Sequence, residues 1–320
     1  MLASLIKKLL IGVALAINLA NSSVAAENWP NRTVVLVAPF GAGGVTDVIA
    51  RTVAKQLQEE LGQPVVVENK PGASGNIAAS LVARAKPDGY TLMLISNGMV
   101  AVSPLIQETL NYDAFKDFVY ISMIAKNPLA LVVSEKSSIR DLRSLMAQAR
   151  QQPDGITFAS SGIGTSIHQT LTLLQQAADT TFLHVPYKSG AEAVNALLSG
   201  DVQVSAVETV VVGPYIESGR MRALGVTSDQ RVPRLSGIPT ITEQLGVEFD
   251  VGSILGLVAP KDTPASIIKR LESVMAKVVN SEDMQNLFAR GSQPTPVGSE
   301  AFQDRMRGEV VKWEKVFGAR

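Results

Sequence analysis

The sequence of 320 residues contains no cysteine and only two histidines, His168 and His184. The lack of cysteine excludes a disulfide framework, a thiolate metal site and a cysteine nucleophile. It also excludes a lipid-anchored precursor, which would need a cysteine at its cleavage site. No spacing of histidines and carboxylates indicates a metal site, and we therefore predict that the chain holds neither a metal nor a cofactor.

The sequence also lacks an excess of either charge, with 29 basic and 29 acidic residues. Proteins that bind nucleic acid usually carry a basic surface, so this balance argues against nucleic acid as a partner. Hydrophobic residues make up 46% of the chain and charged residues 18%, a composition that can bury ordinary globular cores.

Residues 1–26 have the pattern of a secretory signal peptide. Lys7 and Lys8 precede an uncharged apolar run over residues 9–20, and small residues lead up to Ala25 and Ala26. The alternative is an uncleaved membrane anchor, but a span needs roughly 20 predominantly apolar residues. We predict cleavage after Ala25 or Ala26. An exported protein without an anchor would diffuse away from a single-membrane cell, so we expect the periplasm of a Gram-negative cell.

From residue 33 onward, short β-rich runs alternate with glycine-rich turns and amphipathic helices. This alternation predicts an α/β protein with parallel-rich sheets flanked by helices. A mature chain of about 290 residues exceeds the usual size of a single core, so we expect two domains. The predicted strands are residues 33–38, 64–68, 90–95, 129–133, 156–159, 182–186, 202–207, 221–226 and 249–259. The predicted helices include residues 45–61, 76–85, 139–149, 191–198, 210–217, 264–279, 282–289 and 299–317.

Two glycine-rich segments, residues 39–47 and 160–166, each lie between a predicted strand and a predicted helix. Glycines let the backbone approach a ligand closely, and the first N–H groups of a helix lack partners. Each segment can therefore bind an anion. Two such segments that face each other across a cleft would suit a molecule with a carboxylate at one or both ends. The alternative for either segment alone is a tight turn and a helix cap.

The common nucleotide-binding and catalytic motifs are missing. The dinucleotide fingerprint Gly-x-Gly-x-x-Gly is broken by Thr46 in the first segment and by Ile167 after the second, and no Walker motif is present. Gly-x-Ser-x-Gly and His-Glu-x-x-His are also absent. The one conceivable nucleophile pair is Ser160 or Ser161 with His168, and we predict that the chain is not an enzyme.

Several short motifs follow one another along the mature chain. They are Trp29-Pro30, Pro39-Phe-Gly-Ala-Gly-Gly-Val-Thr-Asp47 with Arg51, Val67-Glu-Asn-Lys-Pro-Gly72, Lys86-Pro-Asp-Gly-Tyr-Thr-Leu92, Tyr112-Asp113 with Lys116-Asp-Phe118, Ser161-Gly-Ile-Gly-Thr165 with His168, His184-Val-Pro-Tyr-Lys188, Arg222-Ala-Leu-Gly-Val-Thr-Ser228, Gly256-Leu-Val-Ala-Pro260 and Thr263-Pro264. In this order they resemble the substrate-binding proteins of tripartite tricarboxylate transporters, also called the Bug family.

The resemblance implies a two-domain periplasmic-binding-protein fold of type II, with a ligand cleft between domains that the chain crosses twice. It places the first domain at residues 27–127 plus 249–320 and the second at residues 128–248. It implies capture of a small carboxylate by domain closure and delivery to the membrane subunits of a transporter. We expect a monomer, because the halves of such a binding protein must move. The ligand-binding residues that it implies are Phe40, Gly41, Gly44, Thr46, Asp47, Ser160, Ser161, Gly164, Thr165 and His168.

The chain departs from the family pattern at two places. Ser189 stands where many members have glycine, a change that could simply shift a turn. Val207 and Glu208 stand where members often have Asp and Asn near the ligand. We therefore add Glu208 to the candidate site, with the hypothesis that it favours a ligand whose far end is cationic or donates a hydrogen bond, since an unpaired buried carboxylate would repel a second anion. The alternative is that Glu208 caps a helix in solvent.

Three functions stay open at this point. The first is a receptor that delivers a carboxylate to a transporter, and the second is a sensor that signals to a membrane regulator. The third is a hydrolase that uses Ser160 or Ser161 with His168. Citrate-like tricarboxylates, dicarboxylates, aromatic acids and acidic amino acids are all compatible with the sequence.

Overall fold

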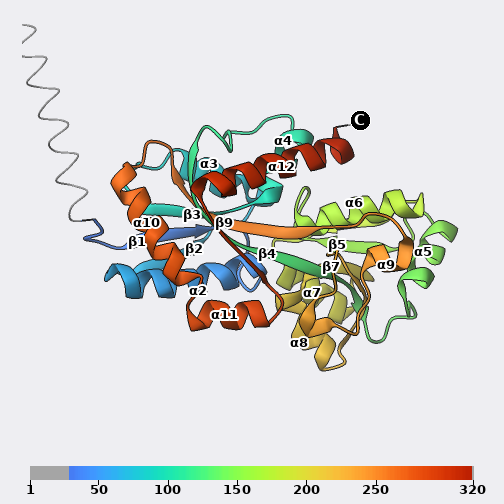
Figure 1. Ribbon diagram of the computed structural model, residues 1–320. Coiled ribbons are helices and arrows are strands. Elements are labelled where there is room, and N and C mark those ends of the chain that lie inside the picture. The colour runs from blue at the N-terminus through green and yellow to red at the C-terminus, as the bar shows by residue number, and fades with distance from the viewer. Residues whose placement is uncertain (1–28, 319–320) are drawn as a thin grey trace, which may run out of the picture.

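The computed structural model describes residues 29–318, and Figure 1 shows how their helices and strands are arranged. The predicted signal peptide lies outside the described residues. Strands and helices alternate along the chain, as the sequence predicted for an α/β protein. Within residues 29–318, no helix combines the length and the apolar composition that a membrane crossing requires.

The strands form one mixed sheet, with parallel pairs toward both ends and antiparallel pairs in the middle. Its order is β2-β1-β3-β9-β4-β7-β5-β6, with β8 and β10 paired to β4. We call the part with β1, β2 and β3 the first half and the part with β5, β6 and β7 the second half. The strands are β1 (Val34–Ala38), β2 (Val65–Asn69), β3 (Thr91–Ser96), β4 (Phe118–Ser134), β5 (Thr157–Ser160), β6 (Leu183–Pro186), β7 (Val204–Glu208), β8 (Met221–Val226), β9 (Gly252–Pro260) and β10 (Gln293–Gly298).

The strand β4 runs through both halves. As far as Pro128 it pairs with β9, and from Leu129 onward it pairs with β7 and β8. The sequence predicted a strand only over residues 129–133, so it was wrong for residues 118–128. The polar and proline residues just before residue 129 hide the strand in the sequence, because they interrupt its apolar run.

Helices cover both faces of the sheet (Figure 1). They are α2 (Val45–Leu61), α3 (Asn76–Ala83), α4 (Ser103–Ile106), α5 (Leu142–Gln151), α6 (Ser166–Ala178), α7 (Gly190–Ser199), α8 (Thr209–Glu217), α9 (Ile241–Leu245), α10 (Ala265–Val278), α11 (Glu282–Ala289) and α12 (Ser299–Phe317). The predicted bounds of α2, α11 and α12 are confirmed. Gly62 ends α2 because its φ of 70° lies in the left-handed region that glycine adopts freely. The sequence missed α4, α9 and the π-helical turn Gly98–Val102, which span five residues or fewer and show no periodic pattern. It also missed β10, whose sequence contains two prolines and so does not indicate a strand.

Each half of the sheet has its own buried core. In the first half, Ile49 of α2 and Leu271 of α10 are buried in one cluster, while Leu171 of α6 belongs to a cluster in the second half. The helix α12 takes part in both halves, because Phe302 is buried near β3 and β4 and Trp313 is buried in the second-half cluster. This helix therefore links the two halves along their length (Figure 1).

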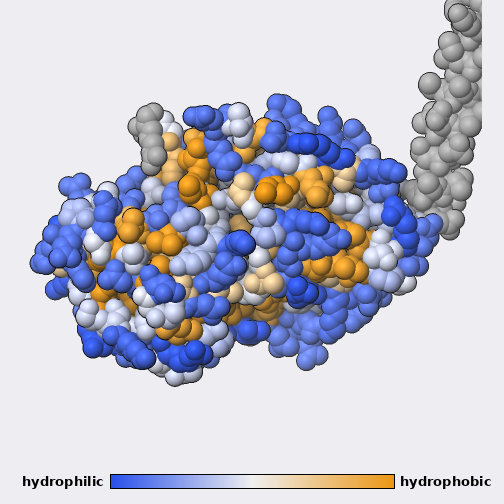
Figure 2. All heavy atoms as spheres, turned by 180° about the vertical axis from the view of Figure 1, so that it is seen from behind, coloured by the Kyte–Doolittle hydropathy of each residue, from blue (hydrophilic) through white to orange (hydrophobic). Residues whose placement is uncertain are grey.

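The surface on the side opposite to the view of Figure 1 is mostly hydrophilic, with small separate hydrophobic patches (Figure 2). The exposed large hydrophobic side chains are Val66, Ile77, Leu81, Ile163, Leu183, Val247 and Val311. They come from several elements of both halves.

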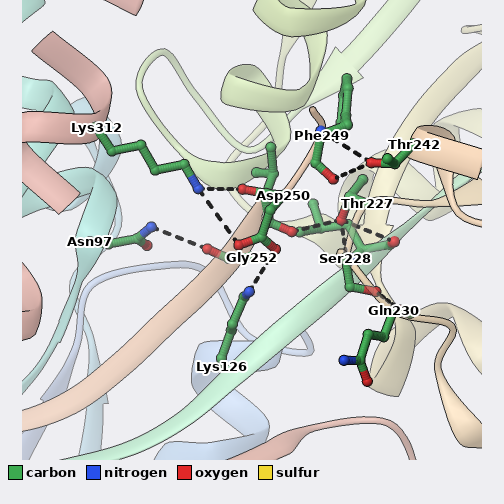
Figure 3. Close-up of polar contacts among 12 residues, drawn as sticks. Asn97, Lys126, Thr227, Ser228, Gln230, Thr242, Phe249, Asp250, Gly252 and Lys312 are labelled. Atoms are coloured by element: carbon green, nitrogen blue, oxygen red, sulfur yellow. Dashed lines mark hydrogen bonds and ion pairs between the residues drawn. The ribbon is translucent and has the colours of Figure 1, made fainter. Parts of the chain in front are cut away.

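A polar network joins the strands where the chain crosses between the halves (Figure 3). Asp250, just before β9, accepts a hydrogen bond from Lys126 Nζ of β4 at 2.6 Å, and Lys312 Nζ of α12 lies 3.8 Å from its other oxygen. Thr227, after β8, donates its hydroxyl to the carbonyl of Val251 at 2.7 Å. These contacts hold residues 250 and 251, just before β9, against β4 and against the end of β8. They lie at the level where β4 changes its pairing partner.

Candidate functional site

A small polar cavity lies between the halves, beyond the carboxyl ends of β1, β3, β5 and β7. This is the position where open α/β sheets bind ligands. The cavity has a volume of about 20 Å³, close to the room that a single water molecule needs. Its lining residues are Phe40, Gly44, Val45, Thr46, Ser96, Asn97, Ser161, Thr165, Ser166, Ser189, Gly190, Glu208 and Ser253.

Four helices begin at this cavity, namely α2, α6, α7 and α8. The helix α7 is capped by Ser189, whose hydroxyl accepts a hydrogen bond from the N–H of Glu192 at 3.2 Å. In the described part of the chain, the residues that directly precede α2, α6 and α8 make no side-chain hydrogen bond to the first turn of their helix. The N–H groups at the start of α2 and α6, together with the positive ends of the helix dipoles, therefore favour an anion in the cavity.

The remaining donors around the cavity are mainly hydroxyl groups, including those of Ser96, Ser161 and Ser253. Among residues 29–318, no lysine or arginine lines the cavity. The same residues contain no group of three or more histidine, aspartate or glutamate side chains that could hold a metal ion. An anion in the cavity would thus be recognised by helix starts and neutral hydroxyls.

The loop between β1 and α2 is fixed from behind by Asp47. Its carboxylate accepts hydrogen bonds from the N–H of Gly43 at 3.0 Å, from Arg51 Nε at 3.1 Å and from Asn69 Nδ2 at 3.0 Å. Burial would raise the pKa of Asp47, but these hydrogen bonds outweigh burial and lower the pKa. Asn69 Nδ2 also donates to the carbonyl of Phe40 at 3.0 Å. Asp47 therefore shapes the loop and does not itself line the cavity.

The loop between β5 and α6 is fixed by both histidines. Ser160 Oγ lies 2.6 Å from His184 Nε2 and accepts a hydrogen bond from the N–H of Gly162 at 3.0 Å. His168 Nδ1 accepts from the N–H of Gly164 at 3.2 Å, and its ring lies 5.0 Å from that of His184. Burial lowers the pKa of His184. Ser160 is fully buried and pairs with His184 rather than His168, so its hydroxyl serves the loop.

Glu208 is the only ionisable side chain in the cavity lining of the described residues. It ends β7, directly precedes α8 and is only 5% exposed. Ser166 Oγ donates to its Oε1 at a long distance of 3.4 Å. Burial raises the pKa of Glu208 to about 7, although hydrogen bonds from its own N–H and from Ser166 act in the opposite direction.

The two halves touch each other beside the cavity. The N–H of Gly41, in the first half, donates to the carbonyl of Lys188, in the second half, at 3.1 Å. At Gly98 a Cβ atom would lie only 2.7 Å from the carbonyl oxygen of Gly164, so this approach requires glycine. The structure therefore shows a closed arrangement of the halves.

A larger pocket of about 620 Å³ lies next to the cavity and shares Phe40 and Ser161 with it. Apolar side chains of both halves line much of it, among them Ile106, Ile163 and Tyr187. A carboxylate bound in the small cavity could extend its remaining atoms into this pocket.

The structure brings part of the predicted site together. Phe40, Gly44, Thr46, Ser161, Thr165 and Glu208 line the cavity, whereas Gly41, Asp47, Ser160, Gly164 and His168 are not among its lining residues. The predicted residues did not include Val45 and Ser166, although both lie within the two predicted anion-binding segments. The sequence analysis missed Ser96, Asn97, Ser189, Gly190 and Ser253 altogether. Ser96 and Asn97 directly follow the predicted strand over residues 90–95. Because open α/β sheets bind ligands beyond the carboxyl ends of their strands, the sequence could have predicted both residues. Ser253 had no such signal, because it enters the site from the antiparallel strand β9.

Comparisons with known proteins show which family this chain belongs to. Residues 49–317 match the profile of the family described as "Tripartite tricarboxylate transporter family receptor". The "UPF0065 protein in tcbD-tcbE intergenic region" of Pseudomonas sp. (strain P51) is 36% identical over 315 residues, which cover 97% of this chain and 93% of that protein.

Two solved structures have nearly the same fold. Rpa4515 of R. palustris with adipate superposes with a TM-score of 0.86 at 34% identity, covering 90% of this chain and 97% of that one. The periplasmic binding protein BugD superposes with a TM-score of 0.87 at 32% identity, covering 91% and 98%. The predicted periplasmic-binding-protein fold is confirmed.

The family match covers most of the chain, and the structural neighbour BugD is a periplasmic binding protein rather than an enzyme. This agreement removes the hydrolase alternative. The chain belongs to the tripartite tricarboxylate transporter receptor family and is a solute-binding protein.

Proposed function

We propose that this protein captures a small organic acid, a di- or tricarboxylate or a related compound, in the periplasm. The observation that carries the proposal is the meeting of four helix starts around a polar cavity with no lysine or arginine among its described lining residues. Helix starts bind carboxylates through N–H groups and their dipoles. Adipate, with which the structure of Rpa4515 was solved, belongs to this class of compound.

In this proposal the ligand carboxylate binds between the starts of α2 and α6, held by N–H groups of residues 40–47 and 160–165. The ligand body extends toward the larger pocket of about 620 Å³. The residues that contact the ligand are those that line the cavity, while Asp47, Ser160 and His168 position the two loops.

Capture requires the halves to open, because the small cavity alone holds about 20 Å³. We propose domains at residues 27–127 plus 249–320 and at residues 128–248. Their boundaries fall at the network of Lys126, Thr227 and Asp250, where β4 changes its pairing partner. Bending there would separate Gly41 from Lys188 and open the cavity.

The proposed partners are the membrane subunits of a tripartite transporter, to which the closed, ligand-bound monomer delivers its cargo. A second candidate function is that of a sensor, in which the same closed state signals to a membrane regulator. The family match favours the transporter. Purification of the protein together with its membrane partner, followed by identification of that partner, distinguishes the transporter from the regulator.

Thermal unfolding of the ligand-stripped mature protein with adipate, succinate, citrate, benzoate and glutamate tests the capture of organic acids. A ligand at about 1,000 times its dissociation constant adds roughly 4 kcal/mol to the free energy of unfolding, which raises the Tm by several degrees. Equimolar sodium chloride controls for ionic strength. A folded protein whose Tm no acid raises would contradict the proposal.

A matched pair of variants ties binding to the cavity. Ser161→Trp places a large side chain where the cavity and the larger pocket meet, and we expect it to abolish the Tm shift. Ser236→Trp makes the same change at an exposed position that lines neither the cavity nor the larger pocket, and it should leave the shift unchanged. Equal shifts in both variants would place the ligand elsewhere.

A further inference from the structure

The buried carboxyl of Glu208 has no cationic partner among the described residues, although it lies where an anion is expected to bind. Its side chain accepts a hydrogen bond from the hydroxyl of Ser166 at 3.4 Å. The backbone of Gly190 also borders it, since a Cβ there would lie 3.4 Å from Glu208 Oε2. Glu208 therefore shares a cavity of about 20 Å³ with the starts of α2, α6 and α7.

Several charged groups on the elements around Glu208 form ion pairs with other residues. On α2, Asp47 pairs with Arg51, and on β4, Lys126 pairs with Asp250. On α8, Glu217 pairs with Arg234. None of these six residues lines the cavity.

Two further titratable groups lie on neighbouring helices. His168 of α6 accepts a hydrogen bond from the N–H of Gly164, and Glu192 of α7 accepts one from the N–H of Lys188 at 3.1 Å. Neither side chain lines the cavity. A carboxylate ligand would therefore meet Glu208 without an intervening cation from these elements.

We propose that Glu208 holds a proton whenever a ligand carboxylate occupies the cavity, so that ligand capture takes up a proton and Glu208 donates a hydrogen bond to the ligand. This inference rests on the proposed capture of a carboxylate. Through this proton uptake, Glu208 makes the affinity for the ligand depend on pH.

The physical reason is the repulsion of two like charges in one enclosed space. Two carboxylates that share a site share a proton, because one of the two pKa values is strongly raised. Burial within the protein already raises the pKa of Glu208 to about 7. At neutral pH a second anion therefore needs to raise this pKa only a little further for Glu208 to hold a proton. The ionised ligand keeps the N–H groups of the helix starts as donors, and protonated Glu208 adds an O–H donor.

The sequence-based hypothesis placed Glu208 opposite a cationic or donating far end of the ligand. The structure places it beside the donors that would hold the carboxylate itself. The two arrangements predict opposite effects of pH. A ligand ammonium facing Glu208 would bind more tightly as Glu208 ionises, whereas a ligand carboxylate facing it would bind less tightly.

The experiment measures the dissociation constants of adipate, succinate and glutamate at pH 6.5 and pH 8.5 by calorimetry, in pairs of non-carboxylate buffers with different ionisation enthalpies. With a pKa of about 7, the protonated fraction of Glu208 falls roughly 20-fold between these pH values, and the affinity should fall by a similar factor. The buffer dependence should give an uptake close to one proton per ligand at pH 8.5.

Glu208→Gln keeps the shape and always has an N–H donor, so it resembles the protonated form. We expect it to bind equally at both pH values, with the affinity that the unmodified protein has at pH 6.5. Glu217→Gln is the matched control, because it removes a carboxylate at the surface end of the same helix α8. It should keep the roughly 20-fold pH dependence that the unmodified protein owes to Glu208.

Affinities that are equal at both pH values in the unmodified protein, with no proton uptake, would leave the proposed function standing and overturn this inference. Tighter binding at pH 8.5 would also overturn it, and tighter binding of glutamate alone would favour a ligand ammonium at Glu208. A failure of every acid to bind at either pH would overturn the proposed function, and the inference with it.

Discussion

The two sides of the cavity each carry one buried acidic side chain, and the two have opposite surroundings. On the α2 side, Asp47 is surrounded by Arg51, Asn69 and the N–H of Gly43, and its pKa is lowered. On the α8 side, Glu208 has the hydroxyl of Ser166 as its side-chain partner, and its pKa is raised to about 7.

The comparison teaches that burial by itself does not assign a role to a carboxyl group. Asp47 is 4% exposed and Glu208 is 5% exposed, so the difference comes from their partners. A carboxylate whose oxygens are all engaged organises a loop, whereas one without a counterion can respond to a ligand or a proton. Variants that change these side chains and their partners one at a time separate the two roles. Their expected effects on the free energy of unfolding range from about 3 kcal/mol to less than 1 kcal/mol.

The largest expected effect comes from Glu208→Gln on stability at high pH. A pKa raised from 4.5 to about 7 leaves the folded state unaffected below pH 4.5 and destabilises it progressively up to pH 7. The full effect is about 3 kcal/mol, because one pKa unit corresponds to about 1.4 kcal/mol. Urea unfolding should show that Glu208→Gln is more stable than the unmodified protein by about 3 kcal/mol at pH 8 and nearly equal at pH 4. The same stability gain at both pH values would show that Glu208 does not titrate in this range.

The next effect is a loss of stability in Asp47→Asn. The new amide would place N–H groups against Arg51 and Asn69 and leave donors unsatisfied, at a cost of about 1–3 kcal/mol at pH 7. Because the pKa of Asp47 is lowered, its contribution is complete above its unfolded pKa near 3.8 and is lost as the pH falls through the folded value. Unfolding at pH 7 and pH 3 should therefore show a difference between the proteins that shrinks in acid. Ligand affinity should also fall, because the loop before α2 loses its anchor.

A smaller effect is expected at two neighbouring serines with different roles. Ser160→Ala removes the partner of His184 Nε2 and of the Gly162 N–H, so the free energy of unfolding should fall by about 1 kcal/mol. Ser161→Ala removes a hydroxyl from the cavity lining and should weaken ligand binding with little change in stability. Thermal unfolding and calorimetry of both variants test this division. Equal effects of the two changes on ligand affinity would contradict this division.

The smallest effect is expected at Arg51, whose side chain is 57% exposed. Exposed ion pairs contribute about 0–1 kcal/mol, and Asp47 keeps its bonds to Asn69 and Gly43 when the guanidinium is removed. Arg51→Gln should thus lower the free energy of unfolding by less than about 1 kcal/mol, and added salt should reduce the same interaction in the unmodified protein. A loss as large as that in Asp47→Asn would mean that the ion pair, and not the neutral donors, holds the loop.

The sequence predicted much of the fold and about half of the cavity lining. Helix α2 was predicted with its observed bounds, because its apolar period and Gly62 lie within or directly after the helix itself. Glu208 was selected as a departure from a family pattern, and it lines the cavity. By contrast, the strand β4 was predicted over residues 129–133 alone, since its first part becomes a strand through pairing with the distant β9 and β10.

The sequence by itself determined the features that depend on neighbouring residues: the alternation of strands and helices, the two glycine-rich loops at helix starts and the absence of thiol chemistry. Only the tertiary structure decided which polar groups meet. Ser160 pairs with His184 rather than His168, and Ser253 reaches the cavity from β9. The physical reason is that local periodicity sets the conformation of a segment, whereas the pairing of strands far apart in the chain sets which carboxyl groups find partners and which, like Glu208, do not.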